Sequence, residues 1–313
     1  MQFPVIYLLN VSEPAAATPF ADRLAAVVQE RRSQLVVGLD PRLELLPLEL
    51  SGEAPTNRAA AADAFTRFCR GLIDAVCPYV VAVKPQAACF EVIGADGMRA
   101  LEEVCEYAAT AGLLVLLDAK RGDIGHTARA YASAYLEPRN GSGPLADALT
   151  VSTYLGRDSL EPFVTSCRRS GGGLFCLVKT SNPGGTDVQD LTLSDGSPVW
   201  QHVAKLVAEL GEDVVGECGL SSIGAVVGAT YPRAVSEARR LLPQSILLLP
   251  GIGAQGATPA DVARAFTSGP ASALVTVSRS VIYAFRFEGD DWRAAAGAEA
   301  ARLRGEVWAA SGW

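Results

Sequence analysis

Two carboxylates and an ammonium group follow one apolar run of the sequence at close spacing. Residues 113–117 form the run, and Asp118, Lys120 and Asp123 come directly after it. Such a run is typical of a strand buried on both faces, where side chains two residues apart share a face. Asp118 and Lys120 are therefore predicted to meet. In one interpretation they form an ordinary ion pair and Asp123 is a helix N-cap. In the other, the neighbouring carboxylates keep the ammonium group of Lys120 charged for chemistry.

Eight short β-rich runs, each followed by a helical pattern, recur along the chain. This alternation indicates βα units around a parallel sheet. Eight units close most naturally into a single (β/α)8 TIM barrel, and an open doubly wound sheet is the alternative. The predicted strands are residues 35–40, 80–84, 113–118, 148–152, 174–179, 223–228, 246–251 and 272–279.

Polar residues stand where several of these strands end. In a barrel of this kind, catalytic residues lie at the carboxyl ends of the strands, which meet at one mouth. The concentration of charge there exceeds what solubility needs, and it predicts a functional site. The residues concerned are Asp40, Lys84, Asp118, Lys120, Ser152 and Arg279.

Glycines after the seventh strand and an arginine after the eighth suggest a phosphate site. The loops after these two strands commonly bind phosphate in such barrels, because glycine lets backbone N–H groups approach an anion. Gly253 and Arg279 are the candidates here. The long polar loop after the fifth strand, residues 179–189, is predicted to be a lid or a flexible surface loop, with Gln189 as a candidate phosphate contact.

Composition restricts the class of protein further. The 313 residues carry a net charge of -7, which argues against nucleic acid or an anionic membrane as a partner. The seven cysteines are scattered without C-x-x-C spacing, and no basic leader precedes the first apolar residues, so a cytoplasmic protein is expected. We expect residues 1–17 to be an appendage and residues 18–313 to form one barrel domain with a C-terminal helix; the segment 41–56 reads as a loop insertion.

Three motifs resemble the orotidine 5′-phosphate decarboxylase family, in its longer bacterial subgroup. Together they extend the resemblance from about residue 18 to residue 285. The first motif alone is shared with a metal-dependent phosphosugar lyase branch, whereas the combination is specific. The motifs are Asp118-x-Lys120-x-x-Asp123-Ile124-x-x-Thr127, then Thr180-Ser181-Asn182-Pro183-Gly184, then Pro250-Gly251-Ile252-Gly253 with Ser278-Arg279.

The resemblance implies decarboxylation of orotidine 5′-phosphate to uridine 5′-phosphate (UMP), the last step of de novo pyrimidine biosynthesis, without metal or cofactor. It also implies a homodimer, with Asp123, Ile124 and Thr127 crossing to the partner's site. Threonine at 153, where the subgroup usually has proline, leaves Thr150 as an alternative to Ser152. The implied roles are catalysis for Lys84, Asp118, Lys120 and Asp123; ribose binding for Asp40 and Lys84; pyrimidine contact for Ser152 and Pro183; and phosphate binding for Gln189, Gly253 and Arg279.

In this reaction, loss of CO2 leaves a carbanion in the pyrimidine plane, which the site must stabilise electrostatically. Lys120 is the expected stabilising group and proton donor. One alternative is a magnesium-dependent phosphosugar β-keto acid decarboxylase or aldolase, although Lys84 would stand unfavourably beside a metal. Another is a catalytically silent phosphate-binding barrel. Asp118→Ala is expected to stabilise the free protein and to abolish turnover if the charges are catalytic.

Overall fold

Eight parallel strands close into a barrel in strict sequence order, β1 to β8, as the sequence predicts. The computed structural model describes residues 17–52, 57–139, 143–253, 256–288 and 291–313. Most of the predicted N-terminal appendage therefore lies outside the described residues. The strands are β1 Leu35–Leu39, β2 Ala82–Pro85, β3 Leu114–Arg121, β4 Ala148–Val151, β5 Gly173–Lys179, β6 Ser221–Val227, β7 Ser245–Pro250 and β8 Ala273–Val277.

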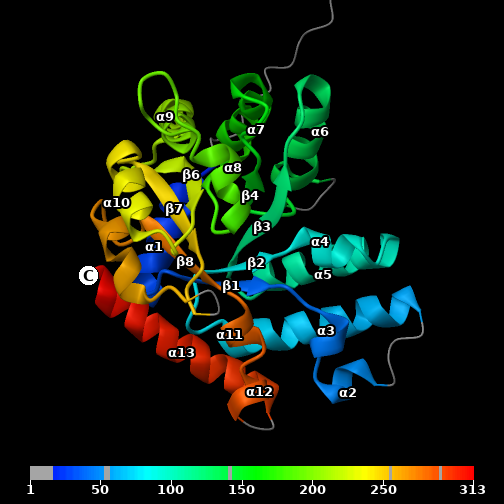
Figure 1. Ribbon diagram of the computed structural model, residues 1–313. Helices are drawn as coiled ribbons and strands as arrows, with labels where there is room; N and C mark the ends of the chain where they lie inside the picture. Colours follow the sequence, from blue (N-terminus) through cyan, green and yellow to red (C-terminus); the bar gives the residue numbers. More distant parts are fainter. Residues whose placement is uncertain (1–16, 53–56, 140–142, 254–255, 289–290) are drawn as a thin grey trace, which may run out of the picture.

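Helices surround the barrel on its outer face (Figure 1). The longer ones are α1 Phe20–Arg31, α3 Arg58–Val76, α5 Ala95–Thr110, α6 Gly125–Leu136, α7 Arg157–Ser170, α9 Val199–Gly211, α10 Pro232–Leu241 and α13 Trp292–Ser311. The short ones are η1 Leu43–Leu45, α2 Leu48–Ser51, α4 Ala87–Glu91, η2 Pro183–Gly185, α8 Thr186–Gln189, η3 Glu212–Val214, η4 Pro259–Phe266, α11 Arg279–Ile282 and α12 Phe285–Glu288. Among the described residues, no helix is both long enough and apolar enough to cross a membrane.

Alternation along the strands divides the apolar core into two layers. One layer, with Phe68 and Leu72 of α3, lies between the sheet and the helices, and the other fills the barrel interior. Phe20 of α1 belongs to the inner layer, and its ring meets that of Phe175 edge to face at 5.9 Å. A Cβ at Gly173 would come within 2.5 Å of the Phe20 ring, so glycine is needed there. Helix α1 thus caps the end of the barrel where the strands begin.

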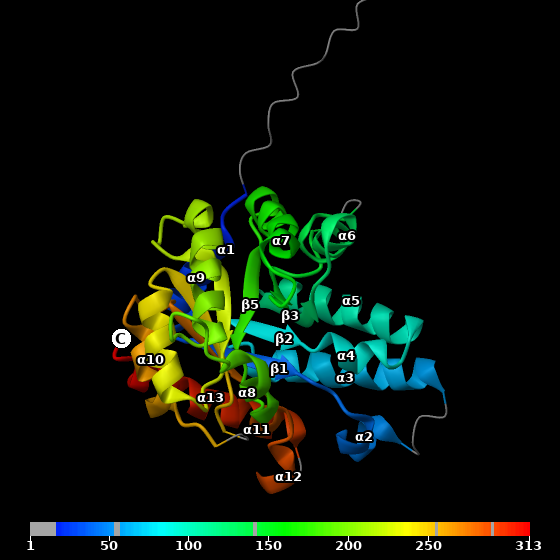
Figure 2. The ribbon, with the colours of Figure 1, turned by 45° about the horizontal axis from the view of Figure 1, so that its top comes forward.

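The segment after β1 is attached to the C-terminal part of the chain. Figures 1 and 2 show α2 against one end of α3. Trp292, the first residue of α13, donates a hydrogen bond from its indole Nε1 to Glu49 of α2 at 2.6 Å. Its ring packs on Phe68 of α3 at a centroid distance of 5.2 Å. The insertion predicted at 41–56 is therefore part of the packed structure over its described residues.

Candidate active site

A cavity of about 440 Å³ opens at the carboxyl ends of the strands. Its apolar wall includes Leu177, Val226 and Leu248 from β5, β6 and β7. Its polar wall brings together residues that the sequence separates by up to about 240 positions. These are Asp40, Lys84, Asp118, Lys120, Thr150, Thr180, Ser181, Asn182, Thr276, Ser278 and Arg279.

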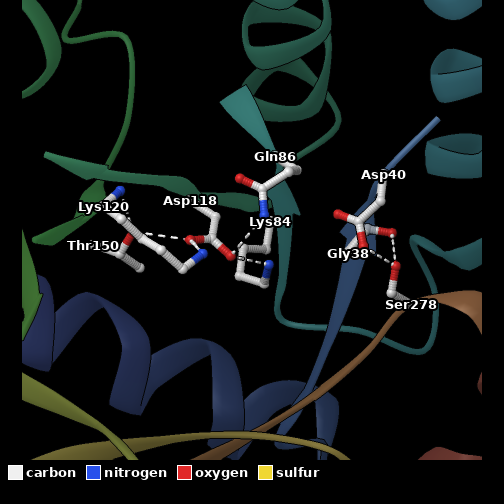
Figure 3. A network of polar contacts seen from close by, with 8 residues as sticks. All are labelled: Gly38, Asp40, Lys84, Gln86, Asp118, Lys120, Thr150 and Ser278. Carbon is white, nitrogen blue, oxygen red and sulfur yellow. Dashed lines mark hydrogen bonds and ion pairs between the residues drawn. The ribbon is translucent and has the colours of Figure 1, made fainter. Parts of the chain in front are cut away.

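Asp118 stands at the centre of the polar wall (Figure 3). Lys84 reaches its Oδ2 at 2.6 Å, and Lys120 reaches its Oδ1 at 2.5 Å. Thr150 also donates its hydroxyl to Oδ1 at 3.0 Å, and the amide of Gln86 lies 3.4 Å from Oδ2. Strands β2, β3 and β4 therefore place their ends around one carboxylate.

The backbone of β3 is irregular where this network forms. Its register against β4 shifts between Leu117 and Arg121, and Lys120 has a left-handed backbone with φ of 47°. Thr150 accepts a hydrogen bond from the backbone N–H of Lys120 at 3.0 Å. The predicted meeting of Asp118 and Lys120 is thus confirmed, and it occurs where β3 has a bulge or similar irregularity.

The two lysines differ in exposure. The side chain of Lys84 is 8% exposed and that of Lys120 is 47% exposed. Burial alone would raise the pKa of Asp118, but the ammonium groups of Lys84 and Lys120 outweigh it and hold that pKa far below its usual range. Burial would lower the pKa of Lys84, whereas the carboxylates of Asp118 and Asp40 raise it. Asp118 and Lys84 are therefore both charged at neutral pH, and Lys120 lies at the wall of the open cavity.

Asp40 lies across the cavity on the side of β1 and β8. Its Oδ2 accepts a hydrogen bond from the hydroxyl of Ser278, and Gly38 leaves the room for this approach, because a Cβ there would lie 2.9 Å from the Cβ of Ser278. Oδ1 of Asp40 and the hydroxyl of Thr276 are buried without a hydrogen-bond partner in the described chain. Buried polar groups of this kind need a partner, which a ligand in the cavity would supply.

The loop after β5 contributes differently from the sequence expectation. Thr180, Ser181 and Asn182 line the cavity, whereas Pro183 and Gln189 are not among its described lining residues. The amide of Gln189 accepts from the backbone N–H of Thr180 at 2.9 Å and donates to its hydroxyl at 2.7 Å. The hydrogen bonds of Gln189 are therefore made within the loop, and its phosphate contact stays a prediction.

Two further sequence candidates lie outside the cavity wall. Thr150 lines the cavity, but Ser152 is not among the described lining residues and packs against Gly122. Gly253 likewise is not among them, although Gly251 and Ile252 of the same loop are. The pyrimidine contact expected of Ser152 and the phosphate contact expected of Gly253 stay predictions.

Asp123, Ile124 and Thr127 lie beyond the cavity of their own chain, where β3 leads into α6. Lys120 has no ion pair with Asp123 in the described part of the chain. Ile124 is 56% exposed, and Tyr154 and Leu155 of the next loop are also exposed apolar residues. Their contribution to a partner's site stays a prediction.

Sequence reasoning missed several polar groups of the site. Ser181, Asn182 and Ser278 were within the motifs but were given no role, and Gln86 and Thr276 were not singled out. Ser278 directly precedes Arg279 and Gln86 follows β2 by one residue, so their positions at strand ends were the available signal.

Comparison with known proteins agrees with this geometry. Residues 33–286 match the model of the family described as "Orotidine 5′-phosphate decarboxylase / HUMPS family". A protein named orotidine 5′-phosphate decarboxylase from Rhodopirellula baltica is 51% identical over 274 residues, covering 86% of this chain and 90% of its own. One of the same name from Deinococcus radiodurans is 45% identical over 266 residues, covering 85% and 89%.

A solved structure has the same architecture. The structure of Leishmania donovani OMP decarboxylase superposes with a TM-score of 0.72 at 33% sequence identity, covering 95% of this chain and 100% of that one. The likeness therefore spans the whole barrel.

Proposed function

The chain belongs to the orotidine 5′-phosphate decarboxylase / HUMPS family, and from this membership we propose that its cavity decarboxylates orotidine 5′-phosphate without metal or cofactor. Its relatives at 45% and 51% identity carry the decarboxylase name, so the chain is a carboxy-lyase of pyrimidine biosynthesis. The observation that carries the proposed mechanism is the Lys84–Asp118–Lys120 network, which opens on the cavity through Lys120.

Lys120 is the proposed catalytic acid. Departure of CO2 leaves the bonding electron pair on C6 of the pyrimidine, and a fixed ammonium group stabilises that charge as it develops. Lys120 then transfers a proton to C6, which gives UMP. Asp118 holds the ammonium at 2.5 Å, so the donor is oriented before the substrate arrives.

Asp118 also acts on the substrate. Its carboxylate lies beside the position proposed for the substrate carboxylate, and two such charges about 4 Å apart repel by roughly 4 kcal/mol at an effective dielectric near 20. Loss of CO2 relieves this repulsion. Both Asp118 oxygens already pair with lysine ammonium groups, which supports chemistry without a metal, since a cation at Asp118 would have to displace or approach an ammonium group.

The remaining contacts bind the substrate remote from the reacting carbon. We assign the ribose hydroxyls to Asp40 and Lys84 and the phosphate to Arg279, all of which line the cavity. For the pyrimidine we favour Thr150, which lines the cavity, over the alternative Ser152, and Ser181 is a further polar residue of the wall. Binding energy from the phosphate offsets the cost of bringing two carboxylates together.

The proposed assembly is a homodimer in which Asp123, Ile124 and Thr127 complete the site of the other subunit. The exposed apolar side chains Ile124, Tyr154 and Leu155 support an interface beside the cavity mouth. All seven cysteines are free thiols, which supports a reducing, cytoplasmic location.

The test is the ultraviolet absorbance of orotidine 5′-phosphate with the purified protein in excess EDTA. The wild type is expected to convert it to UMP, and Lys120→Ala is expected not to. Lys205→Ala, which removes an exposed lysine of α9, is the matched control and should retain full activity. Conversion that requires added Mg²⁺, or full activity of Lys120→Ala, would contradict the proposal.

A further inference from the structure

The hydroxyl of Tyr283 holds the backbone on both sides of Pro41. It donates to the carbonyl oxygen of Asp40 at 3.1 Å and accepts from the backbone N–H of Arg42 at 3.0 Å. Tyr283 lies between α11 and α12, 243 residues further along the chain than Asp40. One side chain from the end of the barrel thus fixes the turn by which the chain leaves β1.

The ring of Tyr283 is itself immobilised. It is 4% exposed and stacks on Phe68 of α3, with the two centroids 6.0 Å apart and the ring planes within 15°. Phe68 packs in turn on Trp292, whose indole N–H is bound by Glu49. This aromatic column connects α13 and the segment after β1 to Asp40.

The hydroxyl is not available for chemistry. Both of its hydrogen-bonding directions are used by backbone groups, and Tyr283 is not among the described residues that line the cavity. Burial raises the pKa of Tyr283, which keeps the hydroxyl neutral and able to donate. Its effect on a bound substrate must therefore pass through Asp40.

We propose that Tyr283 is a positioning residue for Asp40, whose backbone it fixes so that the carboxylate stays against Ser278 at the wall of the cavity, where the substrate ribose is expected. This inference rests on the proposed function, because the ribose contact of Asp40 belongs to that proposal. Asp40 lies one residue beyond the end of β1, where the backbone is free to turn. The Tyr283 hydroxyl restricts this freedom by binding the backbone of Asp40 and Arg42.

Tyr283→Phe removes the hydroxyl and retains the stacked ring. We expect KM for orotidine 5′-phosphate to rise about three- to tenfold, as for the loss of one or two hydrogen bonds, while kcat changes less than about twofold. Tyr107→Phe is the matched control, because its hydroxyl donates to Asp74 at 2.6 Å on the surface, and it should leave both constants unchanged. Phe68→Leu, which removes the ring behind Tyr283, provides a second variant and should also raise KM.

A double-mutant cycle separates positioning from a general structural effect. If Tyr283 acts through Asp40, Tyr283→Phe should change KM less than about twofold in the Asp40→Asn background. Equal effects in the two backgrounds, or a lowered Tm with wild-type KM, would overturn the inference. A wild type that does not turn over orotidine 5′-phosphate would instead refute the proposed function, and the inference with it.

Discussion

Asp118 is the residue on which the site depends, because it compensates two cations at once. Removing it leaves Lys84 buried beside Asp40 alone, and breaking one partner of a buried ion pair typically costs about 3–5 kcal/mol. The ion pairs therefore favour the opposite of the stability change expected from the sequence, which was that Asp118→Ala would stabilise the free protein.

We expect Asp118→Ala to abolish turnover and to lower the free energy of unfolding by about 3 kcal/mol. Urea denaturation with a matched surface variant, Asp63→Ala, measures the difference. Asp63 forms an exposed ion pair with Arg67 one turn along α3, so its loss should cost under about 0.5 kcal/mol. A more stable Asp118→Ala protein would restore the sequence-based expectation.

The same ion pairs determine how this contribution depends on pH. The folded-state pKa of Asp118 is held below its unfolded value of about 3.9, so its contribution is complete above that value and is lost as pH falls toward the folded pKa. The stability difference between wild type and Asp118→Ala should stay constant from about pH 7 to pH 5 and shrink below about pH 4. A difference that already falls between pH 7 and pH 5 would show that Asp118 titrates normally.

Among single residues, the sequence identified those whose position follows from the strand order alone. Asp40, Lys84, Asp118, Lys120 and Arg279 all reach the cavity because each ends or follows a strand. Ser152 and Gly253 lie in loops and Gln189 ends the short helix α8, and the direction of each of these side chains depends on the path of the folded backbone. Local spacing does not contain that information.

At the scale of elements, the loop after β5 is held in place by contacts within the loop and to neighbouring residues. Besides the two hydrogen bonds between Gln189 and Thr180, the buried Lys179 forms an ion pair with Asp190 at 2.6 Å and lies 5.0 Å from the ring of Tyr231. The backbone N–H of Gly228 also binds the carbonyl of Lys179 at 2.7 Å. The loop predicted to be a lid is thus fixed at Lys179 and Thr180, where it leaves β5, and Ser181 lies next to these residues in the cavity wall.

We expect Gln189→Leu to loosen the start of this loop, because it removes both hydrogen bonds to Thr180. The amide of Thr180 should exchange hydrogen faster in the free protein, and KM should rise about three- to tenfold because Ser181 and Asn182 lose their fixed position. Hydrogen exchange followed by mass spectrometry, with Gln201→Leu of α9 as control, measures the first effect. A raised KM with unchanged exchange at Thr180 would instead favour the phosphate contact expected from the sequence.

The strands could be predicted from the sequence, whereas the irregular backbone at Lys120 and the packing of the segment after β1 could not. Every strand lies within a few residues of its predicted range because buried apolar runs are strong signals. The bulge at Lys120 depends on Thr150 of the next strand, and the packing of the segment after β1 depends on Trp292. Both are contacts between distant residues, which periodicity along one chain cannot show.

At the scale of the whole molecule, the proposed homodimer would bring Asp123 of one subunit to Lys120 of the other. Two inactive homodimers, Lys120→Ala and Asp123→Ala, should recover activity when their subunits exchange. Half of the dimers would be mixed with one of two sites intact, so about a quarter of wild-type activity is expected.

Native mass spectrometry of the mixture verifies that exchange took place. Mixing Lys120→Ala with Asp118→Ala is the matched control, because in both variants the damaged residue belongs to the subunit's own network, and no activity should return. Exchange without recovery in the first mixture would contradict a partner-supplied Asp123.

The hydrogen bonds of Tyr283 to the backbone at Asp40 and Arg42 also have a consequence for protein synthesis. The chain leaves the ribosome from its N-terminus, and Asp40 emerges long before Ser278 and Tyr283, with which it forms hydrogen bonds. A ribosome-bound fragment that ends before α11 would contain Lys84, Asp118 and Lys120 but would lack Arg279 and Tyr283. We therefore expect decarboxylase activity only after the C-terminal part of the chain has been synthesised.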